Sequence, residues 1–317
     1  MTTNNNKRTA IANEIATRRF GVEIEFTGIS REAAARAAAS VLCEGPGGRP
    51  VQYLDKWGAC SRKVVDAQGR KWAFVSDCTV PGSTYGCEHG EQSCGATHNP
   101  SRYRSIAPNR GGEFVTPPIR NEADMETLQE VVRAIRRAGG RVTAECGVHV
   151  HVDASDLDTD VLGRVVAMTY SHEELIIGAT RVSRWARPTP ENEAQRMRRG
   201  TSKRDMARAQ GCRYRGLNLH SLNKHGTVEF RYFAGTLHAG EIRAYVTFCL
   251  AMVGAAINSK RTALKQVTPR YAGDKKHAMS HFLLTRLCLN GAENKNVRKH
   301  LLKNLPGTVS GPRRSSR

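Results

Sequence analysis

The stretch GVEIEF, residues 21–26, decides how the chain folds. Its three apolar side chains alternate with Glu23 and Glu25, and alternation with period two is typical of a β-strand that buries one face. Two carboxylates about 7 Å apart on the same face of a strand repel each other unless a cation lies between them. The stretch therefore predicts a strand with a buried back and a divalent-ion site on its polar front.

Two later stretches repeat this design. Three valines alternate with His149 and His151 in CGVHVHVD, and apolar residues alternate with Glu229 and Arg231 in GTVEFRYF. An ordinary exposed sheet face also alternates, but it usually carries Thr, Ser, Lys and Gln. The side chains in these strands are instead groups that bind metal ions and phosphate. We therefore expect the three strands to share one functional surface.

A fourth carboxylate, Glu113, begins the apolar stretch GEFVTPP after two glycines that allow close backbone approach. Mixed carboxylate and imidazole ligands suit Mg²⁺ or Mn²⁺ bound with a nucleotide, whereas the His-x-His pair alone also suits Zn²⁺ or Fe²⁺. The surplus of carboxylates and the presence of Arg231 favour phosphoryl chemistry, in which cations and an arginine neutralise charge on the transferred group.

The order of predicted elements indicates an α+β fold. With 317 residues, of which 39% are apolar, the chain is long enough to bury a core. Strands and helices follow each other without a regular βαβ rhythm, so we expect a largely antiparallel sheet. The predicted helices cover residues 31–42, 121–138, 159–178, 239–258 and 276–289. The predicted strands are RFGVEIEFTG, KWAFVSD, GEFVTPP, CGVHVHVDA, RGLNLHSL and GTVEFRYFAG.

Composition divides the chain into three parts. Residues 1–17 are expected to form a polar N-terminal tail, residues 18–258 a folded domain that holds the candidate site residues, and residues 259–317 a basic C-terminal helical extension and tail. Within the domain, residues 43–110 form a Cys- and Gly-rich insertion. No run of about 18 apolar residues and no apolar leader is visible, and nine scattered cysteines fit reduced thiols, so we expect a cytoplasmic protein.

The net charge of +20 is local. Residues 259–317 hold 14 Lys+Arg against 2 Asp+Glu, residues 181–215 hold 11 against 3, and the remainder is balanced at 24 each. Such segments attract polyanions or gather nucleotide phosphates. The alternative is a solvated tail that only aids solubility.

Six of these pieces resemble, in order, the amidoligase family, which belongs to the glutamine synthetase and glutamate-cysteine ligase superfamily of carboxylate-amine ligases. They are FGVEIEF, KWAFVSD, GGEFVTPPI, CGVHVHVD, RGLNLHSL and HGTVEFRYFAGTL, and together they span residues 20–237. The resemblance implies a glutamine-synthetase-like catalytic domain, with a curved antiparallel sheet, helices on one face, and an open front where ATP and divalent ions bind.

The resemblance also implies a reaction and its residues. ATP would phosphorylate a carboxylate, and the amine of an amino acid, peptide or protein would attack the acyl phosphate to form an amide. Arg231 would steady the γ-phosphate, His151 would lie near the ATP phosphates, and Asp77 matches a position of less defined role. The implied ligands of Mg²⁺ (or Mn²⁺) are Glu23, Glu25, Glu113, His149 and Glu229.

Two weaker signals concern zinc and arginine. Four of the five side chains Cys78, Cys87, His89, Cys94 and His98 could bind a structural Zn²⁺, although their spacing matches no standard motif and loosely ordered cysteines are the alternative.

The second weaker signal lies between residues 213 and 220. Arg213 and Arg215 are expected either to bind ATP or substrate carboxylates or to be solvated. Asn218 and His220 are expected either to line the pocket or to make structural hydrogen bonds.

Three functions remain open from the sequence. The first is the ATP-dependent amide ligase. The second is a non-catalytic module on a ligase-like fold that binds nucleic acid or protein through its basic segments. The third is a metal-dependent hydrolase or oxygenase that uses His149, His151 and a glutamate.

Overall fold

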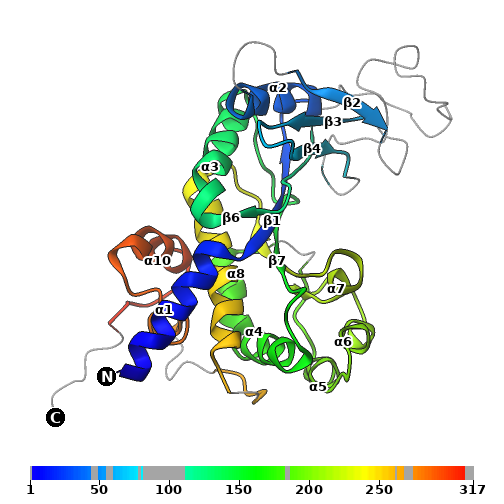
Figure 1. The fold of residues 1–317 in the computed structure, drawn as a ribbon. Coiled ribbons are helices and arrows are strands. Elements are labelled where there is room, and N and C mark those ends of the chain that lie inside the picture. Colours follow the sequence, from blue (N-terminus) through cyan, green and yellow to red (C-terminus); the bar gives the residue numbers. More distant parts are fainter. Residues whose placement is uncertain are drawn as a thin grey trace.

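The chain folds as a nine-stranded sheet with helices packed against it (Figure 1). The computed structural model describes residues 2–43, 49–54, 60–77, 80, 111–182, 186–260, 263–267 and 274–310. The strands are β1 (Arg19–Thr27), β2 (Val51–Leu54), β3 (Cys60–Val65), β4 (Lys71–Val75), β5 (Gly111–Val115), β6 (Ile119–Arg120), β7 (Gly147–Asp153), β8 (Leu217–Asn218) and β9 (Thr227–Ala234). The α-helices are α1 (Thr2–Thr17), α2 (Arg31–Leu42), α3 (Asn121–Arg137), α4 (Thr159–Thr180), α5 (Glu191–Arg198), α6 (Lys203–Ala209), α7 (His220–His225), α8 (Ala239–Ile257), α9 (Lys275–His281) and α10 (Lys295–Leu302).

Strand β1 lies in the middle of the sheet. The strand order is β2-β3-β4-β5-β1-β7-β9-β8, with the short β6 also paired to β1. Every pairing between these strands is antiparallel. The predicted α+β class and largely antiparallel sheet are therefore confirmed.

The apolar face of the sheet is covered by helices. Figure 1 shows α3, α8 and α4 running along one side of the sheet, with α1 and α10 outside α8. Val22, Ile24 and Phe26 of β1 are at most 1% exposed on this side. Full burial of each such side chain contributes about 1.5–3 kcal/mol. The apolar half of the opening stretch therefore belongs to the core, which leaves its two glutamates on the other face.

Residues 2–17, which we expected as a polar tail, form the helix α1. Ile11 is 1% exposed and belongs to the core cluster, and the partly buried Ile15 packs against that cluster. Two apolar residues four positions apart share one side of a helix, so this single contact stripe docks α1 on α8 despite its polar composition. The helix therefore belongs to the folded body.

The predicted strand RGLNLHSL is wrong over most of its length, because β8 stops at Asn218 and α7 begins at His220. At this point two side-chain amide oxygens accept hydrogen bonds from backbone N–H groups. Asn218 Oδ1 accepts from His220 N at 3.0 Å, and Gln210 Oε1 accepts from Leu219 N at 2.6 Å. These bonds replace the next ladder bonds of the sheet and turn the chain into a helix.

Helix α8 is the one helix among the described residues that is long and apolar enough to cross a membrane. Its apolar window has a mean hydropathy of 1.4, but 78% of that window is buried inside the protein. Helices α1, α3, α4 and α10 all pack against it. Its composition is therefore explained by its place at the centre of the helical layer.

His172 is a buried titratable group of this helical layer. Its ring stacks on Phe282 with centroids 3.7 Å apart, and its Nδ1 lies 2.9 Å from the Met168 carbonyl oxygen. Burial lowers the pKa of His172 to about 4. The folded protein therefore holds this imidazole neutral at pH values where the unfolded chain would protonate it.

We predict that His172 makes the fold sensitive to acid. As pH falls from 6.5 towards 4, His172 becomes protonated in the unfolded state but stays neutral in the folded state. This difference lowers the free energy of unfolding by up to about 3 kcal/mol. In urea unfolding at neutral and acidic pH, His172→Gln should lose less stability on acidification than the wild type. The exposed His281→Gln variant should behave like the wild type, and an equal acid loss in all three proteins would refute the prediction.

Candidate active site

The register of three neighbouring strand pairs gathers acidic and imidazole side chains on the sheet face opposite the helices. The facing pairs are Glu25 with Glu113, Glu23 with His149, and His151 with Glu229. Directly opposed residues in antiparallel strands have Cβ atoms about 4.5–5.5 Å apart, so each pair is within reach of contact. The four adjacent strands β5, β1, β7 and β9 thus supply one group of ligands.

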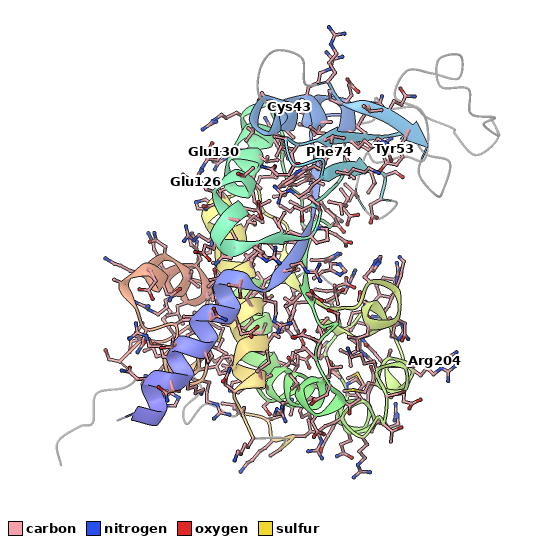
Figure 2. The ribbon with its side chains drawn as sticks, viewed as in Figure 1. Cys43, Tyr53, Phe74, Glu126, Glu130 and Arg204 are labelled. Atoms are coloured by element: carbon pink, nitrogen blue, oxygen red, sulfur yellow. The ribbon has the colours of Figure 1, made fainter. Side chains whose placement is uncertain are left out.

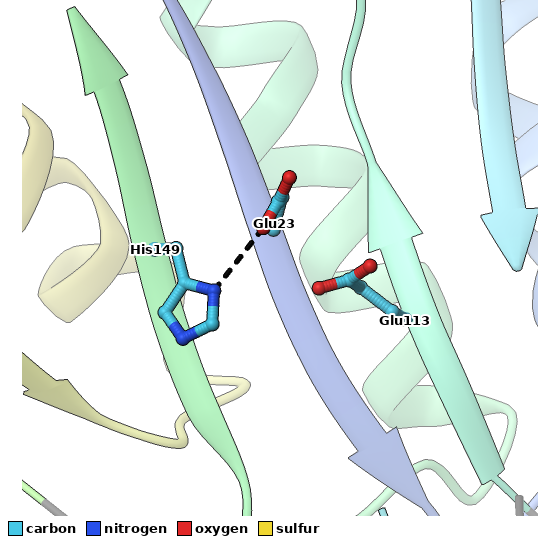
Figure 3. A group of neighbouring side chains, drawn as sticks. All are labelled: Glu23, Glu113 and His149. Carbon is cyan, nitrogen blue, oxygen red and sulfur yellow. Dashed lines mark hydrogen bonds and ion pairs between the residues drawn. The ribbon is translucent and has the colours of Figure 1, made fainter. Parts of the chain in front are cut away.

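Three sets of these side chains bring ligand atoms within 4.8 Å of one another. Within the described residues, the sets are Glu23–Glu113–His149, Glu23–His151–Glu229 and Glu25–Asp77–Glu113. Figure 3 shows the first set, with Glu23 on β1 between His149 on β7 and Glu113 on β5. Glu23 and Glu113 each belong to two sets, so the three sets form one continuous group, which we call the ligand strip.

Glu23 lies between two imidazoles at the centre of the ligand strip. Its Oε2 is 3.1 Å from His149 Nδ1, and its Oε1 is 3.3 Å from His151 Nε2. Burial opposes ionisation of Glu23, but the bonds to the two histidines outweigh it and hold the pKa of this carboxyl well below its usual range. Burial lowers the pKa of His151, but Glu23 reverses this and raises it overall. The Glu23 carboxyl is therefore ionised at neutral pH.

Glu229 is held by three donors. Asn218 Nδ2 and Ser221 Oγ donate to its Oε2 at 2.6 and 3.0 Å, and Arg231 Nη1 donates to its Oε1. Burial raises the pKa of Glu229, but the positive charge of Arg231 more than offsets this and lowers it overall. The carboxylate is therefore ionised and fixed in orientation, with Oε1 on the side of His149, 3.9 Å from Nδ1.

The opposite end of the ligand strip gathers three carboxyl groups. Glu113 and Glu25 are only 9% and 5% exposed, and Asp77 completes their set. Burial raises the pKa of Glu113 well above its usual range, and the charges of Glu23, Asp77 and Glu25 raise it further. Burial likewise raises the pKa of Glu25, although Gly147 N donates to its Oε2 at 2.7 Å. A cation bound here would remove an electrostatic cost that these residues impose on each other.

A close approach between β4 and β5 brings Asp77 to Glu113. A Cβ atom at Gly112 would lie 2.7 Å from the Val75 carbonyl oxygen and 2.8 Å from Cγ of Arg31, which is fully buried beneath the strand. Only glycine fits this position without displacing backbone. Gly112, the second of the two glycines before Glu113, therefore allows the close backbone approach that the sequence suggested.

Arg231 presents a polar atom that the described part of the chain leaves unsatisfied. Its side chain is 13% exposed, and its Nε is buried without a hydrogen-bond partner. Its Nη1 lies 3.4 Å from His149 Nδ1, and its guanidinium lies 5.9 Å from the centroid of the Tyr214 ring. A buried donor without a partner costs free energy, so an anion placed at Nε would complete the site.

A pocket of about 380 Å³ opens beside Glu23 and His151. Gly21 lines it without a side chain, and the ion pair between Arg19 and Asp153 at 2.8 Å forms part of its polar lining. Volumes of this order accommodate small organic ligands. The site therefore combines a ligand strip with an adjoining space for a molecule.

The structure places Arg215 and His220 outside the ligand strip. Arg215 donates to both carboxylate oxygens of Glu193, at 3.1 and 2.7 Å, and to the Pro188 carbonyl oxygen. His220 Nε2 lies 3.0 Å from the Gln210 carbonyl oxygen. Both side chains therefore hold the fold of the α5–α7 segment. The proposed zinc ligands Cys78, Cys87, His89, Cys94 and His98 lie outside the described residues.

Sequence reasoning missed three residues around the site. Ser221 donates to Glu229 from α7, Thr227 Oγ1 lies 3.1 Å from His151 Nδ1, and Tyr214 lies over Arg231. Ser221 and Tyr214 belong to no alternating strand, so no periodic pattern marks them. Thr227 does continue the alternation of Glu229 and Arg231 towards the start of β9, and this signal could have identified it.

The donors of the ligand strip fit divalent cations. The set of Glu25, Asp77 and Glu113 offers only carboxylate oxygen, which suits Mg²⁺ or Mn²⁺, and the sets that contain His149 or His151 add imidazole nitrogen. The pKa of Glu113 is raised by its burial and by the charges of Glu23, Asp77 and Glu25, and a bound cation would oppose this shift. These residues could therefore hold more than one ion.

The fold and the ligand strip define an α+β protein with a carboxylate-rich metal-type site, and comparison with known families agrees with the sequence resemblance. The family described as "Putative amidoligase enzyme" matches residues 16–253, so the chain belongs to the amidoligase family. No curated protein sequence gives a significant match.

Two solved ligase structures are similar to the chain only distantly. The glutamine synthetase of Plasmodium falciparum gives a TM-score of 0.34 at 11% identity over 86% of this chain and 58% of its own. A bifunctional glutathione synthetase from Pasteurella multocida gives a TM-score of 0.38 at 10% identity over 95% of this chain and 50% of its own. The chain thus spans only about half the length of these two proteins.

We predict that Glu113 weakens the fold when no cation is bound. The unfolded chain ionises this carboxyl near pH 4.5 and the folded chain only at higher pH, so folding loses stability as pH rises through that interval. Without divalent ions near pH 7.5, Glu113→Gln should melt higher than the wild type by about 2–4 °C, the shift expected for about 1 kcal/mol in a domain of this size.

Divalent ions should reverse the order of the two melting temperatures. Mg²⁺ or Mn²⁺ should raise the melting temperature of the wild type and have a smaller effect on Glu113→Gln, because the variant lacks one ligand. Glu126→Gln, on the exposed face of α3 (Figure 2), is the matched control and should follow the wild type in both conditions. A wild type that is insensitive to both ions would contradict a metal site at this position.

Proposed function

We propose that the protein is an ATP-dependent carboxylate-amine ligase that forms an amide bond through an acyl phosphate. The observation that carries the proposal is the combination, on one sheet face, of the ligand strip with the unsatisfied Nε of Arg231. Carboxylates that hold cations, next to a guanidinium that lacks an anion, are what phosphoryl transfer requires. Membership of the amidoligase family supports the same reaction class.

The residues of the ligand strip would hold Mg²⁺ (or Mn²⁺), with Glu25, Asp77 and Glu113 as the all-oxygen set. Glu23 would hold a second ion together with His149 and Glu229, which each belong to one of the two sets that contain Glu23, and His151 would lie beside this ion. Bound divalent ions supply positive charge that neutralises phosphate oxygens and orients them for transfer. In this assignment Glu25, the second glutamate of GVEIEF, is a ligand of a divalent ion.

Arg231 and its neighbours would then act on the transferred group. A carboxylate oxygen of the acid substrate attacks the γ-phosphorus of ATP, the bond to the β–γ bridging oxygen breaks, and ADP leaves. Arg231 Nε donates to a phosphoryl oxygen, while Glu229 fixes the guanidinium from its other side. His151, which is held by Thr227, would lie beside the phosphates.

Amide formation completes the reaction. The amine nitrogen attacks the acyl carbon, the carbon–oxygen bond to phosphate breaks, and the nitrogen gives up a proton. The pocket beside Glu23 and His151 would hold one of the two substrates next to the reacting atoms. The proposal assigns this chemistry to residues 18–258 in a cytoplasmic protein, with residues 259–317 as a basic extension.

Isotope transfer tests the acyl phosphate directly. Incubation with ATP, Mg²⁺ and a pool of ¹⁸O-labelled carboxylic acids should give carboxylate-dependent ADP and move label into inorganic phosphate. Hydroxylamine in place of the amine should trap the intermediate as a hydroxamate. We predict that Arg231→Lys, which keeps the charge but lacks the planar fork, lowers the rate of ADP formation about 10²–10³-fold.

The control for Arg231→Lys is Arg136→Lys, at an exposed position on α3. It should keep the wild-type rate. Formation of AMP in place of ADP, or phosphate without ¹⁸O, would rule out the acyl phosphate. Salt-sensitive binding of nucleic acid without nucleotide turnover would favour the non-catalytic binding module instead.

A further inference from the structure

The α5–α7 segment carries an exposed arginine surface beside the site. Residues 186–225 hold ten Lys+Arg against three Asp+Glu, and eight of the ten are arginine. The exposed arginines are Arg187, Arg196, Arg199, Arg204, Arg208 and Arg213, and we call the last five the arginine surface. Figure 2 shows Arg204 projecting from α6 away from the rest of the protein. Like charges gathered on one surface repel each other, so this composition has an electrostatic cost.

Acidic neighbours do not balance these arginines within the part of the chain that the structure describes. Arg196, Arg199, Arg204 and Arg208 form no ion pair there, and Asp205 bonds to Ser202 instead. Helix α3 shows the contrasting arrangement, in which Arg133 pairs with Glu130 at 2.6 Å. Among the described residues, these four arginines of α5 and α6 therefore carry charge that no direct ion pair offsets.

Arg213, one member of the arginine surface, lies beside the reaction centre. The guanidinium of Arg213 lies 4.9 Å from the Tyr214 ring centroid, and that of Arg231 lies 5.9 Å from the same centroid. Arg231 N donates to the Gly216 carbonyl oxygen at 2.7 Å, which fixes this loop to β9. One aromatic ring thus separates the end of the arginine surface from the guanidinium of the site.

We propose that the arginine surface binds an acidic peptide segment that carries the carboxylate substrate. Arg213 and its neighbours hold several side-chain carboxylates of the segment, and one carboxylate passes Tyr214 to reach Arg231. This inference rests on the proposed ligase function, because the reaction consumes a carboxylate. Arginine suits such a ligand because its planar fork binds carboxylates through two hydrogen bonds.

The chemistry of the surface favours a peptide over nucleic acid. A nucleic acid offers no carboxylate to the reaction. Proteins that bind single strands also present free aromatic rings on which bases stack. Tyr214, the aromatic residue at this surface among the described positions, is already flanked by Arg213 and Arg231.

Fluorescence anisotropy with a labelled deca-glutamate peptide tests the binding without any turnover. The wild type should bind it at low salt, bind a deca-glutamine peptide far more weakly, and lose affinity as salt rises. Arg204→Glu/Arg208→Glu should weaken binding about tenfold or more, because two attractive charges become repulsive. Arg136→Glu/Arg137→Glu on α3 makes the same charge change at another exposed position and should alter binding less than about twofold.

A second pair of substitutions guards against local unfolding of α6. Arg196→Glu/Arg199→Glu changes α5 and its C-cap and should weaken binding in the same way, with each variant's melting temperature measured alongside. Unchanged peptide affinity in both folded double variants would overturn the proposal. Tighter binding of a ten-nucleotide single-stranded DNA than of deca-glutamate, lost in the same variants, would also overturn it.

Steady-state kinetics separate this inference from the ligase proposal. ADP release with deca-glutamate should show a KM about tenfold higher in Arg204→Glu/Arg208→Glu with kcat unchanged, because the substitutions lie outside the ligand strip. ADP release with free glutamate but not with the peptide would overturn the inference and leave the ligase intact. Peptide binding without ADP release from any carboxylate would instead refute the ligase.

Discussion

The antiparallel register of β1 between β5 and β7 is the constraint on which both the core and the site depend. Side chains alternate along a strand, so a slip of one residue would move every group to the opposite face. Such a slip would bring Glu23 and Glu25 under α8 and expose Val22, Ile24 and Phe26 to water. The same pairing that excludes the carboxylates from the core places Glu23 opposite His149. Folding and ligand geometry are therefore fixed by one set of backbone hydrogen bonds.

The buried carboxyl groups at the two ends of the ligand strip have pKa values shifted in opposite directions. Glu23 and Glu229 carry lowered pKa values because histidines and Arg231 compensate them from within the protein. Glu113 and Glu25 carry raised pKa values because burial and other carboxylates oppose their ionisation. At the first end, histidines and Arg231 favour the ionised carboxylates, whereas at the second end a bound cation would favour ionisation. Cation binding should therefore be felt most strongly between β5 and the end of β4.

Sequence periodicity identified the strip because each of its main members sits on a strand that alternates. Period two gives the face of Glu23, His149 and Glu229 without knowledge of any neighbour. It does not give the positions of Tyr214 and Ser221, which depend on how loops and short helices pack. The failure of the RGLNLHSL strand has the same origin, because side-chain amides from residues 210 and 218 redirect the backbone. Local patterns thus predicted the polar face of the sheet but not the α5–α7 segment, which carries Tyr214 and Ser221.

The position of the α5–α7 segment depends on the helix-covered face of β9 as well as on its polar face. Tyr232 donates to the buried Glu173 at 2.7 Å, which holds its ring beneath the sheet. A Cβ atom at Gly216 would lie 1.9 Å from this ring, so only glycine lets the loop pass close enough for its carbonyl oxygen to accept from Arg231 N. Tyr214 and Asn218 lie two residues before and after that glycine. Tyr214 over Arg231 and Asn218, which orients Glu229, are therefore both placed by the contact between Gly216 and Tyr232. This contact lies on the helix-covered face of the sheet.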